Sequence, residues 1–167
     1  MTLRPYRPED AAVILSWIRD ERSFRQWSAD RYDRFPISTE EMNNHYARLA
    51  ASERFFPVTA EDESGIAGHM ILRYTDESRS VIRFGFVIVD SGRRGKGLGR
   101  TMLGLAVQLA FDEMNAKTVT LGVFENNEPA LRCYRSAGFR EVWTNEEEVF
   151  HISGEDWKCM EMEYGAH

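Results

Sequence analysis

Hydrophobic and polar residues recur at two different periods along the chain, and these periods divide it into helices and strands. Segment 8–21 opens with proline and acidic residues and continues with an apolar side, which predicts a helix. In segment 38–51, Ser38 precedes Glu41 by the spacing of a capping box, and apolar residues follow at helical intervals. Segment 22–37 lies between these helices, is rich in aromatic residues and has no clear period. We expect it to be an ordered surface loop.

From residue 55 onward the pattern is mainly that of strands. Runs of β-branched and aromatic residues between turn residues, with a short run near the start of the chain, predict strands at 3–6, 55–62, 66–74, 80–89, 117–124, 139–143 and 156–164. Segment 98–115 is apolar almost all round, as expected of a helix packed on a sheet, and 127–138 predicts a helix with Gly138 as its C-cap. The expected order is β-α-α-β-β-β-α-β-α-β-β, an α/β (α+β) arrangement.

Length and composition predict one globular domain over residues 1–167, because 43% of the residues are hydrophobic and only five are proline. The chain begins with polar and charged residues and has no apolar run near the ~20 residues of a membrane span, so we expect a soluble, cytoplasmic protein without a membrane partner. A net charge of -6 argues against nucleic-acid binding and suits a cationic small molecule or peptide. Cys133, Cys159 and the scattered histidines lack ligand spacing, so we expect no metal site.

The segment "SGRRGKGLGR", residues 91–100, follows an apolar strand and opens a helix. It is neither a Walker A loop, which would need lysine at Leu98, nor a dinucleotide-binding fingerprint, which would need glycine at Arg100 or Met102. A helix N-terminus with glycines nevertheless offers free N–H groups and close backbone approach, which favours a phosphate or pyrophosphate. The alternative is a glycine turn with solvated arginines.

Two separated motifs resemble the GNAT family of acetyl-CoA-dependent N-acetyltransferases: Arg94-x-x-Gly97-x-Gly99 after "FVIVD", and "VFENNEPALRCYRSAGF". The resemblance implies a mixed, mostly antiparallel sheet of about six to seven strands with about four helices. It also implies acetyl-CoA as cosubstrate, an amine acceptor on a small molecule or peptide N-terminus, and a monomer or homodimer. The residues that it assigns to coenzyme A are Val87, Ile88, Val89, Arg94, Gly95, Lys96, Gly97, Leu98, Gly99, Arg100 and Asn127.

Acetyl transfer from a thioester requires stabilisation of an oxyanion and protonation of a leaving thiolate. A backbone N–H at Val87 or its neighbour is the candidate for the first task, and the Tyr134 hydroxyl is the candidate for the second. Tyr134 could instead cover the joint between helix and sheet, and Asn127 could cap the helix that follows it as well as contact coenzyme A. Cys133 is expected to be a packed apolar residue, because direct transfer needs no acyl-enzyme.

The general base is not assigned by the sequence. Several members of the family place a glutamate five residues before the asparagine, where this chain has Gly122. Glu125, His69 and Glu141 are the substitutes considered, although a strand histidine more often has a structural role. The run 146–148 of glutamates is expected to be a solvated hairpin face.

The acceptor pocket is expected between the loop 23–36 and the carboxyl-terminal strands, with Trp27, Tyr32 and Phe35 binding substrate. These aromatic residues could instead anchor the loop. Two functional classes follow: an enzyme that moves an acetyl group directly to a primary amine, or a catalytically silent module that senses acyl-CoA.

Overall fold

The computed structural model describes residues 1–165. Its elements are β1 (Thr2–Pro5), α1 (Asp10–Ser16), α2 (Glu21–Ser28), α3 (Thr39–Ala50), β2 (Phe55–Asp62), β3 (Gly65–Tyr74), β4 (Val81–Val89), the 3-10 turn η1 (Ser91–Arg93), α4 (Leu98–Asp112), β5 (Thr118–Phe124), α5 (Glu128–Ser136), β6 (Arg140–Glu141), β7 (Glu148–Ile152) and β8 (Glu155–Gly165).

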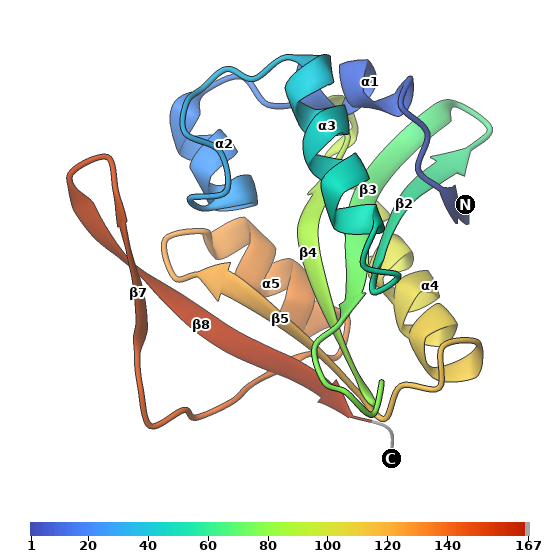
Figure 1. Ribbon diagram of the computed structural model, residues 1–167, viewed down its shortest axis with the longest axis vertical. Coiled ribbons are helices and arrows are strands. Elements are labelled where there is room, and N and C mark those ends of the chain that lie inside the picture. Colours follow the sequence, from blue (N-terminus) through green and yellow to red (C-terminus); the bar gives the residue numbers. More distant parts are fainter. Residues whose placement is uncertain (166–167) are drawn as a thin grey trace.

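The strands form one mixed sheet in the order β1-β2-β3-β4-β5-β8-β6 (Figure 1). Neighbours are antiparallel except β4 and β5, which are parallel and are joined through α4. β7 pairs with the outer edge of β8 at the amino-terminal end of that strand, whereas β6 pairs near its carboxyl-terminal end. The predicted mixed, mostly antiparallel fold is confirmed, with β7 added to the predicted strands and α2 to the predicted helices.

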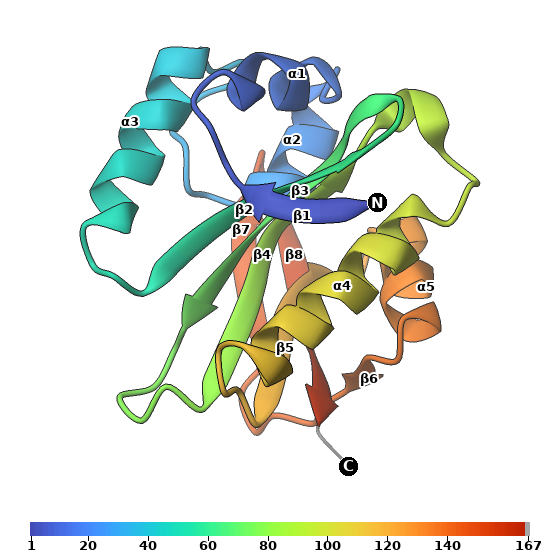
Figure 2. The ribbon, with the colours of Figure 1, turned by 90° about the vertical axis from the view of Figure 1, so that its right-hand side faces the viewer.

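Helices cover both faces of the sheet (Figure 2). α4 and α5 bury one face in a core that includes Phe84, Leu103 and Phe139. α1, α2 and α3 bury the other face in a core that includes Phe24 and Tyr46. β4 contributes to both cores: Ile82 and Phe84 lie in the first, whereas Phe86 lies in the second, because the irregularity in the pairing with β3 reverses which side chains point to each face. The centre of the sheet is therefore covered by helices on both sides.

The prediction of a single helix over 8–21 was wrong in its extent. α1 ends at Ser16, and α2 begins after Asp20, whose extended backbone (φ −138°, ψ 162°) lets its carboxylate accept a hydrogen bond from the N–H of Ser23. The predicted loop thus contains the two turns of α2. The prediction of a helix over 38–51 was correct. This helix is α3, and Ser38 and Glu41 form the predicted capping box at its start.

The carboxyl-terminal region also differs from the expectation. The predicted strand 139–143 shortens to β6. The glutamates at 146–148 are exposed, as expected of a solvated hairpin face, and the last of them begins β7. Glu148 begins β7 opposite Cys159, and Glu147 pairs with Lys158 at 2.7 Å. The C-cap of α5 is Ala137, and Gly138 follows it with a positive φ of 104°. Both β6 and β7 are short and are held in the sheet by pairing with β8.

Within residues 1–165, the helices are too short or too polar to cross a membrane.

Candidate active site

β4 and β5 diverge halfway along their length and leave a gap at the centre of the sheet. Their pairing runs from Val81 opposite Thr118 to Phe84 opposite Leu121. Beyond that point Phe86 adopts a positive φ of 48°, and the register of β4 with β3 shifts, which marks a β-bulge. Figure 1 shows β4 turning away from β5 above this point. The candidate residues Val87, Ile88 and Val89 lie beyond the bulge, on the diverging part of β4.

The glycine-rich loop begins directly after this part of β4. Gly95 and Gly97 have φ values of 80° and 72°, which glycine adopts without strain. Gly97 is the N-cap of α4, and the N–H of Thr101 donates to its carbonyl at 3.0 Å, so the N–H groups of Leu98, Gly99 and Arg100 have no acceptor within the helix. These residues lie in the first turn of a fifteen-residue helix, where the macrodipole favours an anion.

The α4 N-terminus lies against α5, and this contact brings the predicted coenzyme residues together. A Cβ atom on Gly99 would lie 2.8 Å from the Sγ of Cys133, so glycine permits the close approach of the two helices. Asn127 is the N-cap of α5 and accepts a hydrogen bond from the N–H of Ala130 at 3.4 Å. Tyr134 is buried one residue after Cys133, and burial raises the pKa of its hydroxyl. Tyr134 is therefore protonated at neutral pH, as a proton donor must be.

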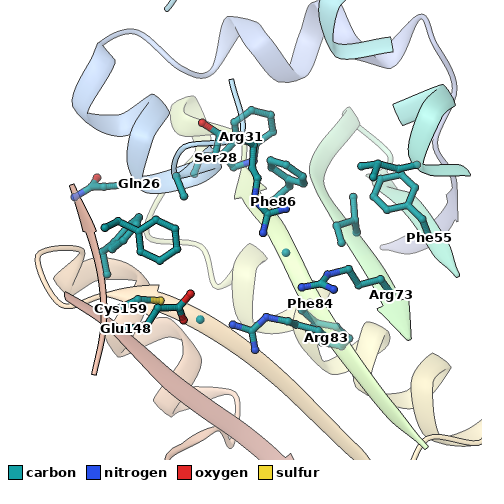
Figure 3. Close-up of a pocket in the computed structure, with 18 residues that line it drawn as sticks. Gln26, Ser28, Arg31, Phe55, Arg73, Arg83, Phe84, Phe86, Glu148 and Cys159 are labelled. Atoms are coloured by element: carbon teal, nitrogen blue, oxygen red, sulfur yellow. The ribbon is translucent and has the colours of Figure 1, made fainter. Parts of the chain in front are cut away.

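A pocket of about 350 Å³ lies where β4 and β5 diverge. Its walls come from α2 and the loop after it, from α3, and from strands β2 to β5, β7 and β8 (Figure 3). The indole of Trp27 lines it and packs on Phe86, with ring centroids 5.0 Å apart. Tyr32 and Phe35 lie outside the lining: Tyr32 bonds to the His45 ring at 2.8 Å, and Phe35 packs on Phe24. The structure thus brings one of the predicted substrate residues to the pocket.

Charged side chains that the sequence reasoning missed also line this pocket. Arg73 on β3 lies directly opposite Arg83 on β4, and Arg31 reaches the pocket from the loop after α2 (Figure 3). Arg83 donates to Glu161 at 2.5 Å and to the Oγ1 of Thr120 at 3.3 Å. The available signal was the presence of arginine within two strands that are otherwise largely apolar.

Gly122 provides the space that Arg83 uses. A Cβ atom at this position would lie 2.7 Å from the Nη2 of Arg83 and 2.9 Å from the Sγ of Cys159. Several family members have glutamate here, whereas in this chain the guanidinium of a neighbouring strand fills the space. The floor of the pocket is therefore positively charged at a position where the family pattern would add a carboxylate.

The candidate bases lie away from the pocket lining. His69 is completely buried, bonds through Nε2 to the Tyr46 hydroxyl at 2.7 Å, and has its pKa lowered by burial to about 3. Glu125 is exposed after β5, and Glu141 pairs with Arg135 at the far edge of β8. Within residues 1–165, histidine, cysteine and carboxylate side chains form no cluster that could hold a metal ion.

Comparisons with known proteins agree with this geometry. The profile of the acetyltransferase (GNAT) family matches residues 15–139. The chain is 25% identical over 150 residues to a spermidine N(1)-acetyltransferase of Vibrio cholerae, covering 90% of this chain and 84% of that protein. It is 28% identical over 137 residues to a spermidine N(1)-acetyltransferase of Escherichia coli K12, covering 82% and 71%.

The fold is also that of a solved structure. The crystal structure of spermidine N-acetyltransferase from Vibrio cholerae in complex with CoA and spermine superposes with a TM-score of 0.80, at 22% identity, over 98% of this chain and 94% of that chain. The family profile spans most of the chain, including the glycine-rich loop and the segment through Phe139. The chain therefore belongs to the GNAT family of acetyl-CoA-dependent N-acetyltransferases.

Proposed function

We propose that the protein transfers an acetyl group from acetyl-CoA directly to the primary amine of a small molecule that enters the pocket beneath α2. The observation that carries this proposal is the divergence of β4 and β5. The gap has the glycine-rich loop and α5 on one side and opens into the pocket lined by Phe84, Gly85 and Gly122 on the other. A thioester held in the gap would be within reach of an amine from the opposite face.

The coenzyme would be held by groups that lack partners within their own elements. Its pyrophosphate would accept hydrogen bonds from the first-turn N–H groups of α4, with Arg94 and Arg100 adding positive charge. The diverging backbone of β4 at Val87, Ile88 and Val89 would bind the pantetheine amides, and Asn127 would contribute its side-chain amide. This arrangement would place the acetyl carbonyl beside the bulge at Phe86.

The reaction needs one new bond and one broken bond. The neutral amine attacks the thioester carbon, a C–N bond forms, and the developing oxyanion is stabilised by a backbone N–H at or near Val87. The C–S bond then breaks, and Tyr134 supplies the proton that turns the thiolate into the coenzyme A thiol. The amine proton passes to solvent, from which Tyr134 is reprotonated. No side chain is assigned as general base.

The relatives suggest which acceptors to assay first. Their names refer to spermidine and spermine, so polyamines are the first acceptor class to test. A pocket of about 350 Å³ suits a small molecule better than a folded protein surface. A peptide N-terminus therefore ranks behind small amines.

Release of coenzyme A thiol tests the proposal. Purified protein would be incubated with acetyl-CoA and a panel of spermidine, spermine, amino acids and a short peptide, with mass detection of the acetylated product. We expect thiol release that depends on one class of amine. A thermal shift with coenzyme A but no thiol release with any amine would instead support a silent acyl-CoA-binding module.

A further inference from the structure

The pocket contains an unusual pair of like charges. Arg73 and Arg83 are direct cross-strand neighbours on the face of the sheet that forms the pocket floor. Side chains in such positions have Cβ atoms only about 4.5–5.5 Å apart, and like charges there are destabilising. The arrangement therefore requires compensating negative charge.

Glu161 compensates only one member of this pair. The Arg83 guanidinium is held by Glu161 and Thr120 in the space that Gly122 leaves. Arg73 has no ion pair and no side-chain hydrogen bond within residues 1–165, although it is only partly exposed. Burial lowers the pKa of Arg73, the neighbouring charges of Arg83 and Arg31 lower it further, and the charge of Glu161 acts in the opposite direction. A desolvated guanidinium without a partner is a strong site for an anion.

Arg31 approaches the same space from above. It belongs to the loop after α2, and Figure 3 shows its side chain pointing down toward those of Arg73 and Arg83. Its side chain is exposed and has no ion pair or side-chain hydrogen bond within the described part of the chain. An oxyanion between Arg31 and Arg73 would receive donors from both sides of the pocket.

Positive charge dominates the pocket although the chain as a whole carries a net charge of -6. The acidic groups that face these arginines are Glu161, which is paired with Arg83, and Glu148 on β7. Glu148 enters from the opposite wall, beside Cys159 and β5 (Figure 3). Glu148 can attract an ammonium group, while Arg73 and Arg31 attract an anion at the other end. A polyamine, which carries only positive charge, would meet repulsion at the arginine end.

Resting on the proposed function, we infer that the acceptor is a small amine that also carries an oxyanion, a carboxylate or a phosphate, bound by Arg73 and Arg31. The amine end lies toward Glu148 and the gap between β4 and β5. The planar guanidinium of Arg73 can bind a carboxylate or phosphate through two parallel hydrogen bonds. Arg73 is thereby a specificity-determining residue of the acceptor pocket.

Matched acceptors test this inference. The amines would be 5-aminopentanoate, 2-aminoethyl phosphate, pentylamine, which has no oxyanion, and spermidine, and kcat/KM would be measured for each. We expect an oxyanion-bearing amine to be preferred over pentylamine and spermidine by about 10-fold or more, since a hydrogen bond to a charged group contributes about 1.5–3 kcal/mol. The two oxyanion-bearing amines distinguish a carboxylate acceptor from a phosphate acceptor.

Arg73→Gln should raise the KM of the preferred amine by about 10- to 100-fold, since it removes that charged contact. It should not raise the KM of pentylamine, which has no oxyanion for Arg73 to bind, and the melting temperature of the free protein should not fall, since the variant removes one of two repelling charges. Arg140→Gln, which removes an exposed arginine on β6 outside the pocket, is the control and should match the wild type.

Two results would overturn the inference without touching the proposed function: spermidine as the best acceptor, or an Arg73→Gln variant that acetylates every amine as the wild type does. If no amine is acetylated, the proposed function fails. Calorimetry with coenzyme A present then tests separately whether the pocket binds an oxyanion-bearing amine. Binding of 5-aminopentanoate or 2-aminoethyl phosphate to the wild type but not to Arg73→Gln would support the inference. Absence of binding of both would contradict it.

Discussion

At the scale of single residues, Gly97 tests the proposed link between backbone conformation and coenzyme binding. Its φ of 72° is left-handed, and it caps α4 where the free N–H groups begin. The left-handed backbone conformation costs a non-glycine residue about 1–3 kcal/mol, and valine is also β-branched. Gly97→Val should therefore weaken acetyl-CoA binding by roughly 5- to 100-fold. Calorimetry measures this, and a melting curve checks that the fold is retained.

Lys96→Ala is the matched control for Gly97→Val, because it changes a neighbouring exposed charge without straining the backbone. It should weaken binding only slightly, since exposed charge contacts contribute little. Equal affinity of Gly97→Val and the wild type would rule out the assignment of the loop to the coenzyme.

The proposed role of Tyr134 as proton donor can also be tested by a single substitution. Burial raises the pKa of its hydroxyl, so the proton is present at neutral pH and is available to the leaving thiolate. Tyr134→Phe removes only this hydroxyl and should lower kcat by about 10²–10⁴-fold with little change in acetyl-CoA affinity. Single-turnover kinetics give the chemical rate directly.

Tyr164→Phe is the control for Tyr134→Phe. Tyr164 packs on Phe139 at a ring-centroid distance of 5.7 Å and lies outside the acceptor pocket, so loss of its hydroxyl should leave kcat unchanged. An unaltered chemical rate in Tyr134→Phe would assign Tyr134 to packing alone.

At the scale of elements, α2 forms one wall of the acceptor pocket. Trp27 faces the pocket and packs on Phe86, so it serves both the wall and the core. Trp27→Ala should raise the KM for the amine by about 10-fold, which corresponds to about 1.4 kcal/mol of lost contact with the substrate. It should also lower the melting temperature, because Trp27 packs on Phe86. Acetyl-CoA affinity should be unchanged, because the proposed coenzyme site lies on the other side of the gap.

Phe35→Ala separates the two roles of such aromatic residues. Phe35 packs on Phe24 with ring centroids 5.1 Å apart and does not line the pocket, so its loss should lower the melting temperature without altering the amine KM. A Trp27→Ala variant that behaves like Phe35→Ala, destabilised but with an unaltered amine KM, would show that Trp27 is only an anchor.

At the scale of the whole molecule, Asp10 joins β1, α1 and β2. Its buried carboxylate accepts hydrogen bonds from Arg4 at 2.8 and 2.9 Å, from the N–H of Arg7 at 2.9 Å and from Thr59 at 2.8 Å. Burial opposes ionisation of Asp10, but the hydrogen bonds from Arg4, Arg7 and Thr59 outweigh it, and its pKa is lowered. Asp10→Asn leaves Arg4 with Glu61 as its remaining carboxylate partner and should reduce the free energy of unfolding by about 1–3 kcal/mol, measured by urea at pH 7.

The same pair predicts how stability depends on pH. Because the pKa of Asp10 is lower in the folded state, its contribution is present above the unfolded pKa of about 3.9 and is lost as pH falls below it toward the folded pKa. Asp10→Asn should therefore lose less stability than the wild type between about pH 5 and pH 3. Asp156→Asn, with a side chain that is 73% exposed, is the control and should follow the wild type. Identical acid profiles for Asp10→Asn and the wild type would refute the role of the pair.

Much of the fold was predictable because its signals are local. The capping box of Ser38 and Glu41, the apolar run that became α4 and the β-branched strands β2 to β5 each carry their pattern within a short window. α2 was missed because a two-turn helix contains too few apolar positions for a period to be recognised. β7 was missed although Val149, Phe150 and Ile152 favour a strand, because the run is only five residues long and follows a series of glutamates.

The sequence by itself determined the order of most elements and the position of the glycine-rich loop, because turn glycines and hydrophobic periods act between near neighbours in the chain. Only the tertiary structure decided the charge of the acceptor pocket. Arg73 meets Arg83 through strand register, Arg83 occupies the space above Gly122, and Arg31 arrives from a loop on the far side. These contacts depend on how strands and helices pack, and no local pattern in the chain specifies which side chains will share a pocket.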